Sequence, residues 1–231
     1  MVQRRSLLGE KQGGDSVMIR YLGVDLPASY FAKISTGHFF FTPRKSGLSS
    51  IPEQPSDASP AGVKAWFSEH LNLTTYEIGI PALRDPSLAG DGKTGMTISI
   101  LFDYEITRAI HAAGWHREFK EIFETTVIDI LNDSVYPGLK AAVQDRFSAT
   151  PVSMARIAGT THGAITGWAF TNEMIPAEHR LTGIANAART PVSHVSQAGQ
   201  WTYTPAGFPI AILTGKVAAD RVGKSLGRGT D

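Results

Sequence analysis

The residues from Gly207 to Ile210 could do chemistry through the peptide backbone. Gly207, Phe208 and Pro209 precede an apolar run and predict the first turn of a helix, where the missing N–H of proline costs nothing. A helix N-terminus presents free N–H groups and a partial positive charge, which suit an electron-rich group such as a phosphate or a reduced flavin ring. The residues that recur at helical spacing predict a buried side of this helix: Ile210, Leu213, Val217 and Arg221/Val222.

The segment before this helix predicts how its first turn is positioned. Residues 192–197 carry the pattern of a strand, and Ala198-Gly199 predicts a turn that leads toward the helix. On periodicity alone, an ordinary core strand followed by a core helix would explain the same pattern.

Other reactive groups are sparse. The chain has no cysteine, which excludes disulfides, thiolate metal sites and cysteine nucleophiles. The seven histidines show no metal-ligand spacing; His111 and His116 flank a glycine near a predicted helix start and need not share a face, so we expect no metal site. The sequence has no Gly-x-Ser-x-Gly or His-Glu-x-x-His pattern, so hydrolase chemistry lacks support.

One literal GxGxxG pattern occurs at Gly90, Gly92 and Gly95. A dinucleotide-binding turn needs a strand before it and a helix after it. Here a turn with proline and serine precedes the glycines, and the β-branched run MTISILF follows them. We therefore predict a loop before a strand. A P-loop is also excluded, because its first glycine would fall on Ser87.

Composition favours a folded protein with a core. Of 231 residues, 42% are hydrophobic and 19% charged, which argues against extended disorder. The net charge of +1 gives no broad basic field for nucleic acid. No apolar run approaches the ~20 residues needed to span a bilayer, and no apolar segment of a signal peptide follows Arg4 and Arg5. We expect a cytoplasmic protein, with peripheral membrane contact as a further expectation.

Strands mixed with helices predict an α+β fold. The expected strands cover 17–22, 38–42, 76–80 and 96–102. Ser59 and Pro60 predict a helix start that runs toward Leu71, and a longer helix begins near Gly114. The longer helix carries an apolar stripe made of Trp115, Phe119, Ile122, Phe123, Val127, Ile130 and Leu131.

Several segments together resemble a known family. The stretch QAGQWTYTPAGFPIAILTGKVAAD resembles the C-terminal flavin-binding segment of the phytoene desaturase-like FAD-dependent oxidoreductases. Upstream, IPALRDPSLAGDGKTGMTISILFDY is similar to a turn and strand of that family, and PGLKAAVQDRFSATPVSM to a helix that leads into a strand. The segment THGAITGW is similar to a glycine-containing stretch that follows, and the likeness spans roughly residues 15–222.

The resemblance implies an FAD site and redox chemistry on an apolar, polyene or lipid-like substrate such as a carotenoid or isoprenoid. The N–H groups of Phe208 and Ile210 would meet the pyrimidine edge of the flavin, and Pro209 would only shape the turn. His162, in the segment that passes near the flavin in this family, is a weak candidate for substrate contact or proton transfer; a structural histidine is the alternative. For Trp168 we expect packing and for Trp201 a role at the cofactor. The implied cofactor residues are Gly199, Gln200, Trp201, Gly207, Phe208, Pro209 and Ile210.

One departure from the family shapes the functional expectation. Members begin with a βαβ unit whose GxGxxG turn binds the ADP half of FAD, and MVQRRSLLGEKQGGDS holds no such turn. We expect a substrate-domain-like α+β layer with a mixed or antiparallel sheet at 1–150, and the C-terminal remnant of a Rossmann-like (α/β) FAD-binding domain at 151–231.

The chain would then be the C-terminal portion or subunit of a desaturase- or dehydrogenase-like flavoenzyme, with an FAD site that it cannot complete alone. Its partner would be a chain or segment that carries the GxGxxG unit, or further copies of itself in a homo-oligomer, with no role for nucleic acid. Two alternatives stay open. The chain could be a non-catalytic binding or assembly module that kept the fold and lost the cofactor, or an ordinary globular α+β domain with an accidental likeness.

Overall fold

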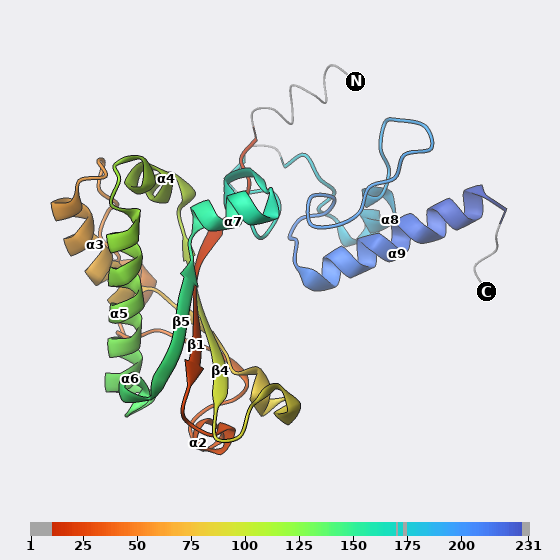
Figure 1. Cartoon of the computed structure of the whole chain (residues 1–231). Coiled ribbons are helices and arrows are strands. Elements are labelled where there is room, and N and C mark those ends of the chain that lie inside the picture. Colours follow the sequence, from red (N-terminus) through yellow and green to blue (C-terminus); the bar gives the residue numbers. More distant parts are fainter. Residues whose placement is uncertain (1–10, 170, 173–174, 228–231) are drawn as a thin grey trace. The chain divides into compact units, whose positions relative to one another are not determined.

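The computed structural model describes residues 11–169, 171–172 and 175–227, and the chain divides into two compact units (Figure 1). The first, Val17–Met154, is called the sheet unit below. The second, the C-terminal unit, combines the residues that precede 17 with those that follow 154. The sequence suggested a division at residue 150 with 1–16 in the first domain; the structure instead groups the described residues 11–16 with the C-terminal part.

The sheet unit is built on an open five-stranded antiparallel sheet with strand order β2-β3-β4-β1-β5. Ile19 lies opposite Ala149 at one edge pair, and Ile78 lies opposite Ile98 near the other edge. This arrangement confirms the predicted α+β class. The strands are β1 (Ser16–Val24), β2 (His38–Phe41), β3 (Tyr76–Gly79), β4 (Thr94–Phe102) and β5 (Val143–Ala149).

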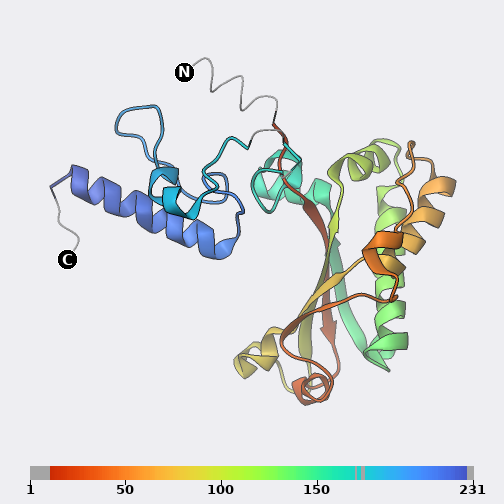
Figure 2. The ribbon, with the colours of Figure 1, turned by 180° about the vertical axis from the view of Figure 1, so that it is seen from behind.

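Helices of the sheet unit cover one face of the sheet, as Figures 1 and 2 show for α3 and α5. The apolar stripe predicted for the long helix is confirmed, because Phe119, Phe123 and Leu131 are fully buried. No helix of this unit covers the opposite face, where Leu101 and Phe147 are exposed. The helices are α2 (Ala28–Ala32), α3 (Pro60–Leu73), α4 (Tyr104–Ala112), α5 (His116–Ser134) and α6 (Leu139–Ala142), with 3₁₀ turns η1 (Gly47–Ser50), η2 (Pro81–Leu83) and η3 (Pro86–Leu88).

The C-terminal unit is held together differently. Apart from the first residue of β1, its described residues form isolated β-bridges, such as Gly13 with Trp168, rather than strands. The Rossmann-like character expected for 151–231 thus stays a prediction. Its helices are α7 (Pro151–Ala158, which spans the boundary), α8 (Ile184–Ala187) and α9 (Phe208–Ser225), with 3₁₀ turns η4 (Thr161–Gly163) and η5 (Leu181–Gly183). In the described ranges, no helix is long and apolar enough to cross a membrane.

Three local expectations are wrong. The stretch 137–154, expected as a helix followed by a strand, forms the one-turn helix α6, then strand β5, then helix α7. Residues 192–197 form turns with a single bridge between Arg189 and Ser196, because Thr190 Oγ1 accepts from the Val192 N–H and donates to the Val195 carbonyl. The buried side predicted for α9 is also wrong, since Thr214 is its one buried residue and Leu213 is 40% exposed.

Candidate functional site

The first turn of α9 leaves two backbone donors without acceptors. Gly207 precedes the helix in an extended conformation, and its carbonyl accepts the Ala211 N–H at 2.9 Å. Pro209 has no N–H. The N–H groups of Phe208 and Ile210 have no hydrogen-bond acceptor among the residues that the structure describes. The Phe208 side chain is 80% exposed, so this end of the helix is open to a ligand or partner.

A buried threonine joins the predicted cofactor turn to this helix. The Gly199 N–H donates to Thr214 Oγ1 at 3.1 Å, and the same hydroxyl donates to the Ile210 carbonyl at 2.9 Å. The Thr202 hydroxyl closes the turn by donating to the Gly199 carbonyl at 2.6 Å. Two groups of residues that are separate in the sequence, 199–201 and 207–210, therefore lie on one hydrogen-bonded network. Thr214 was missed in the sequence because its spacing marks it only as a helix residue.

Trp168 and Trp201 form a contact that holds the 199–202 turn against the segment around Gly167. The rings of Trp168 and Trp201 meet edge to face with centroids 4.8 Å apart, and Trp168 Nε1 donates to the Trp201 carbonyl at 2.9 Å. Gly167 has a left-handed φ of +79°, and a Cβ there would collide with the carbonyl oxygen of Gln200. Glycine is thus required at 167 for the two segments to approach. The two indole rings pack against each other, as expected for Trp168, and the cofactor role of Trp201 stays a prediction.

The turn that contains His162 lies beside this pair. His162 has a left-handed φ of 54° within η4, which is uncommon for a residue other than glycine. Gly13 lies between this turn and Trp201, since a Cβ on Gly13 would come 2.8 Å from the Ala164 Cβ and 3.3 Å from Trp201 Cη2. Sequence reasoning found no role for Gly13; its only signal was a pair of adjacent glycines.

The GxGxxG pattern is confirmed as a loop before a strand. The Lys93 N–H donates to the Gly90 carbonyl at 3.2 Å, Gly92 has a φ of +70°, and β4 begins at Thr94. A dinucleotide turn would instead lead into a helix N-terminus.

Two histidines that, from the sequence, need not share a face lie close together. The ring centroids of His111 and His116 are 5.2 Å apart, and His116 Nε2 bonds to Thr150 Oγ1 at 3.0 Å. Burial, then the nearby His111, lowers the pKa of His116 below its usual value. Within the described ranges, no group of three or more His, Asp or Glu side chains is placed to hold a metal ion.

Comparison with models of known protein families finds no match for this chain, and a search of curated proteins finds none. A functional assignment therefore depends on the local geometry around α9 and on the resemblance of the motifs. Chemically, two unpaired N–H donors at a helix N-terminus can stabilise negative charge that develops on a flat ring or an oxyanion.

Proposed function

We propose that this chain is the C-terminal portion or subunit of a flavin-dependent oxidoreductase, desaturase- or dehydrogenase-like, that acts on an apolar, polyene or lipid-like substrate. The observation that carries the proposal is that the N–H groups of Phe208 and Ile210 have no hydrogen-bond acceptor among the described residues. Thr214 joins this first turn of α9 to the 199–202 turn through hydrogen bonds. The family resemblance assigns Phe208 and Ile210 to the pyrimidine edge of the flavin and residues 199–201 to the cofactor site.

The residues present fit the ring end of FAD. Phe208 and Ile210 would donate to the pyrimidine edge, and the extended backbone at Gly207 would let the chain approach the ring. When bound, the flavin supplies hydride transfer to or from an unsaturated substrate. The ADP half of FAD would be bound by a GxGxxG unit on another chain or segment, because the glycine pattern at 90–95 leads into a strand.

The uncovered face of the sheet supports an apolar substrate. Tyr21 and Phe147 stack across β1 and β5 with ring centroids 4.4 Å apart and planes 13° from parallel. Leu101 and Phe40 are also exposed on strands of this sheet. Apolar and aromatic side chains on an open face suit a long hydrocarbon better than a charged metabolite.

A specific observation favours the second candidate, an assembly module without a cofactor. Phe208, Ile212 and Leu226 of α9 and its C-terminal boundary are each more than half exposed. Exposed apolar helix faces commonly mark protein contacts. In the flavoenzyme proposal, the same face receives a partner that carries the GxGxxG unit or a second copy of the chain.

Flavin binding to two glycine variants tests the proposal. Among the described residues, a Cβ on Gly207 would contact only Pro209 Cδ, at 3.9 Å, so Gly207→Val should fold normally. Titration of the full chain with riboflavin or FAD, followed by amide NMR, should shift the signals of Phe208 and Ile210, weakly and to a similar extent for both flavins. Gly207→Val should abolish these shifts.

Gly90→Val is the matched control, because a Cβ there meets no described residue within 4 Å and the loop belongs to the other glycine motif. It should leave the flavin shifts unchanged. Flavin shifts that survive in Gly207→Val, or that centre on 90–95, would contradict the proposed cofactor turn. Tight, stoichiometric FAD that remains through gel filtration would show that the site is complete in this chain.

A further inference from the structure

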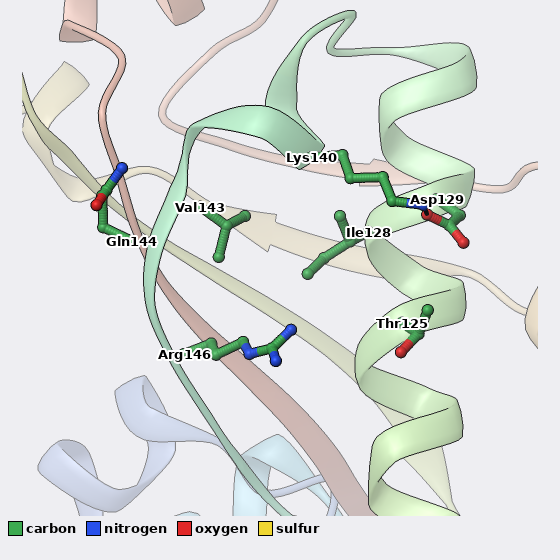
Figure 3. Close-up of a pocket in the computed structure, with 7 residues that line it drawn as sticks. All are labelled: Thr125, Ile128, Asp129, Lys140, Val143, Gln144 and Arg146. Atoms are coloured by element: carbon green, nitrogen blue, oxygen red, sulfur yellow. Dashed lines mark ion pairs between the residues drawn. The ribbon is translucent and has the colours of Figure 1, made fainter.

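A cavity of about 320 Å³ lies between α5 and β5 in the sheet unit (Figure 3). Thr125, Ile128 and Asp129 line it from the helix, and Val143 and Arg146 line it from the strand. The volume falls at the lower end of the range for small-molecule sites. Its walls combine apolar surface with hydrogen-bonding and charged groups, as binding sites for small organic molecules do.

The charges around this cavity do not cancel. Lys140, at the end near α6, pairs with Asp129 through an Nζ–Oδ1 distance of 2.6 Å. Arg146 has neither an ion-pair nor a hydrogen-bond partner among the residues described, and Figure 3 shows its guanidinium directed from β5 toward α5. The lining therefore holds two cationic side chains, Lys140 and Arg146, and a single carboxylate, Asp129.

A second arginine lies near Arg146. Arg20 of β1 is fully buried, and its Nη1 is 3.1 Å from Oε1 of Glu124, the residue before the lining Thr125. Its Nε and Nη2 have no hydrogen-bond partner among the residues that the structure describes. Glu124 is shared, because the Ser148 hydroxyl also donates to it, at 2.5 Å. A buried guanidinium with one shared carboxylate is poorly compensated.

Arg20 and Arg146 lie on the same face of the sheet, the face that α5 covers. Ser148 lies directly opposite Arg20 in the β1–β5 register, and Arg146 is two residues from Ser148, so alternation places both arginines on the helix side of the sheet. Burial lowers the pKa of Arg20, Glu124 opposes that shift, and the positive charge of Arg146 adds to it. Arg20 is closed to solvent and acts through its charge, whereas Arg146 can contact a ligand.

We propose that the cavity between α5 and β5 binds a small organic anion, a carboxylate or phosphate with a short apolar chain. Arg146 would pair with the oxyanion, the Thr125 hydroxyl would donate to it, and Ile128 and Val143 would contact the chain. This site belongs to the sheet unit and uses none of the residues assigned to the flavin.

Calorimetric titration of the full chain with hexanoate, hexyl phosphate, hexanol and inorganic phosphate tests the proposal. We expect hexanoate or hexyl phosphate to bind, and hexanol to bind at least 10-fold more weakly. Inorganic phosphate that binds as tightly as hexyl phosphate would overturn the role of the apolar chain and leave a free oxyanion as the ligand. Equal binding of hexanol and the anions, or no binding of any probe, would overturn the proposal.

Three variants locate the site. Arg146→Gln should weaken anion binding at least 10-fold. Arg117→Gln removes an equally charged, 94% exposed side chain from the start of α5 and should change the dissociation constant less than twofold. Glu124→Gln removes the carboxylate that compensates Arg20 and should tighten anion binding several-fold, provided that circular dichroism shows a folded chain. Equal losses in Arg146→Gln and Arg117→Gln would place any binding outside this cavity.

Discussion

The two units differ in what stabilises them. In the sheet unit, the buried cluster contains large side chains from β1, β3 and β4 and from helices on one face, with Phe67 and Phe119 rings centred 4.4 Å apart. In the described part of the C-terminal unit, the buried hydrophobic residues are three alanines and Tyr203, and the other buried residues are polar residues or glycines. Hydrophobic burial holds the first unit, while the second depends on hydrogen bonds and leaves apolar helix surface open.

A cavity in the aromatic cluster should give the largest effect on stability. Phe119→Ala removes a fully buried ring that contacts Phe67, Phe102 and Trp115. We expect it to lower the free energy of unfolding by about 3–5 kcal/mol. Urea denaturation followed by far-ultraviolet circular dichroism measures this, and a loss below 1 kcal/mol would break the contrast between the units.

Acid should weaken the same cluster through His70. Burial lowers the pKa of His70 to about 4, and neither ring nitrogen has a hydrogen-bond partner in the described part of the chain. The unfolded chain takes up a proton near pH 6.5 and the folded chain only near pH 4, so stability should fall between these values by about 1–3 kcal/mol as the pH decreases.

The matching variant is His70→Phe, which keeps a ring against Trp66 and Phe102. Denaturation at several pH values should show a smaller loss of stability between pH 6.5 and 4 than in the parent chain. An identical pH dependence in both proteins would assign the acid sensitivity to other groups.

In the C-terminal unit, removing the Thr214 hydroxyl should reduce stability more than truncating the apolar side chain of Leu213. Thr214→Val leaves the Gly199 N–H without its acceptor and should cost about 1 kcal/mol. Hydrogen exchange at the Gly199 amide should become faster, while Thr214→Ser should restore slow exchange. Unchanged exchange in Thr214→Val would mean that the 199–202 turn is held by Thr202 and Gly167 instead.

The smallest effect is expected on α9. Leu213→Ala should cost less than about 1 kcal/mol in this chain, because Leu213 is 40% exposed. The buried side that periodicity predicts would have given about 2–5 kcal/mol. Thermal denaturation of the variant distinguishes the two values, and a large loss would show that this helix face is covered in solution, for example by a second copy.

Alternation and amphipathic spacing predicted the strands β1 and β4 and the helix α5 well, because one face of each is buried within the chain. Strand β5 was missed because Gln144, Asp145 and Arg146 at this sheet edge are exposed and lack the alternation of a half-buried strand. On α9, spacing gave the helix but not its burial, since a periodic pattern does not reveal what covers the apolar face.

The candidate site was predictable only in part. The glycine and proline residues at 207–209 indicated the start of α9, and it begins at Phe208. The contacts that join it to the 199–202 turn depend on Thr214, and those beside Trp201 depend on Gly13. Such tertiary partners leave no local pattern in the sequence, because any residue of the right size or hydrogen-bonding capacity would look the same there.

The division of the C-terminal unit between two stretches of sequence has a consequence for synthesis on the ribosome. Gly14 donates to the Gly167 carbonyl at 2.7 Å, and the Gln12 N–H donates to Asn172 Oδ1 at 3.0 Å, a separation of 160 residues. The residues of the sheet unit have all been made once Met154 has been added. During translation the sheet unit can therefore fold first, while residues 11–16 stay unpaired until Gly167 and Asn172 have also been made.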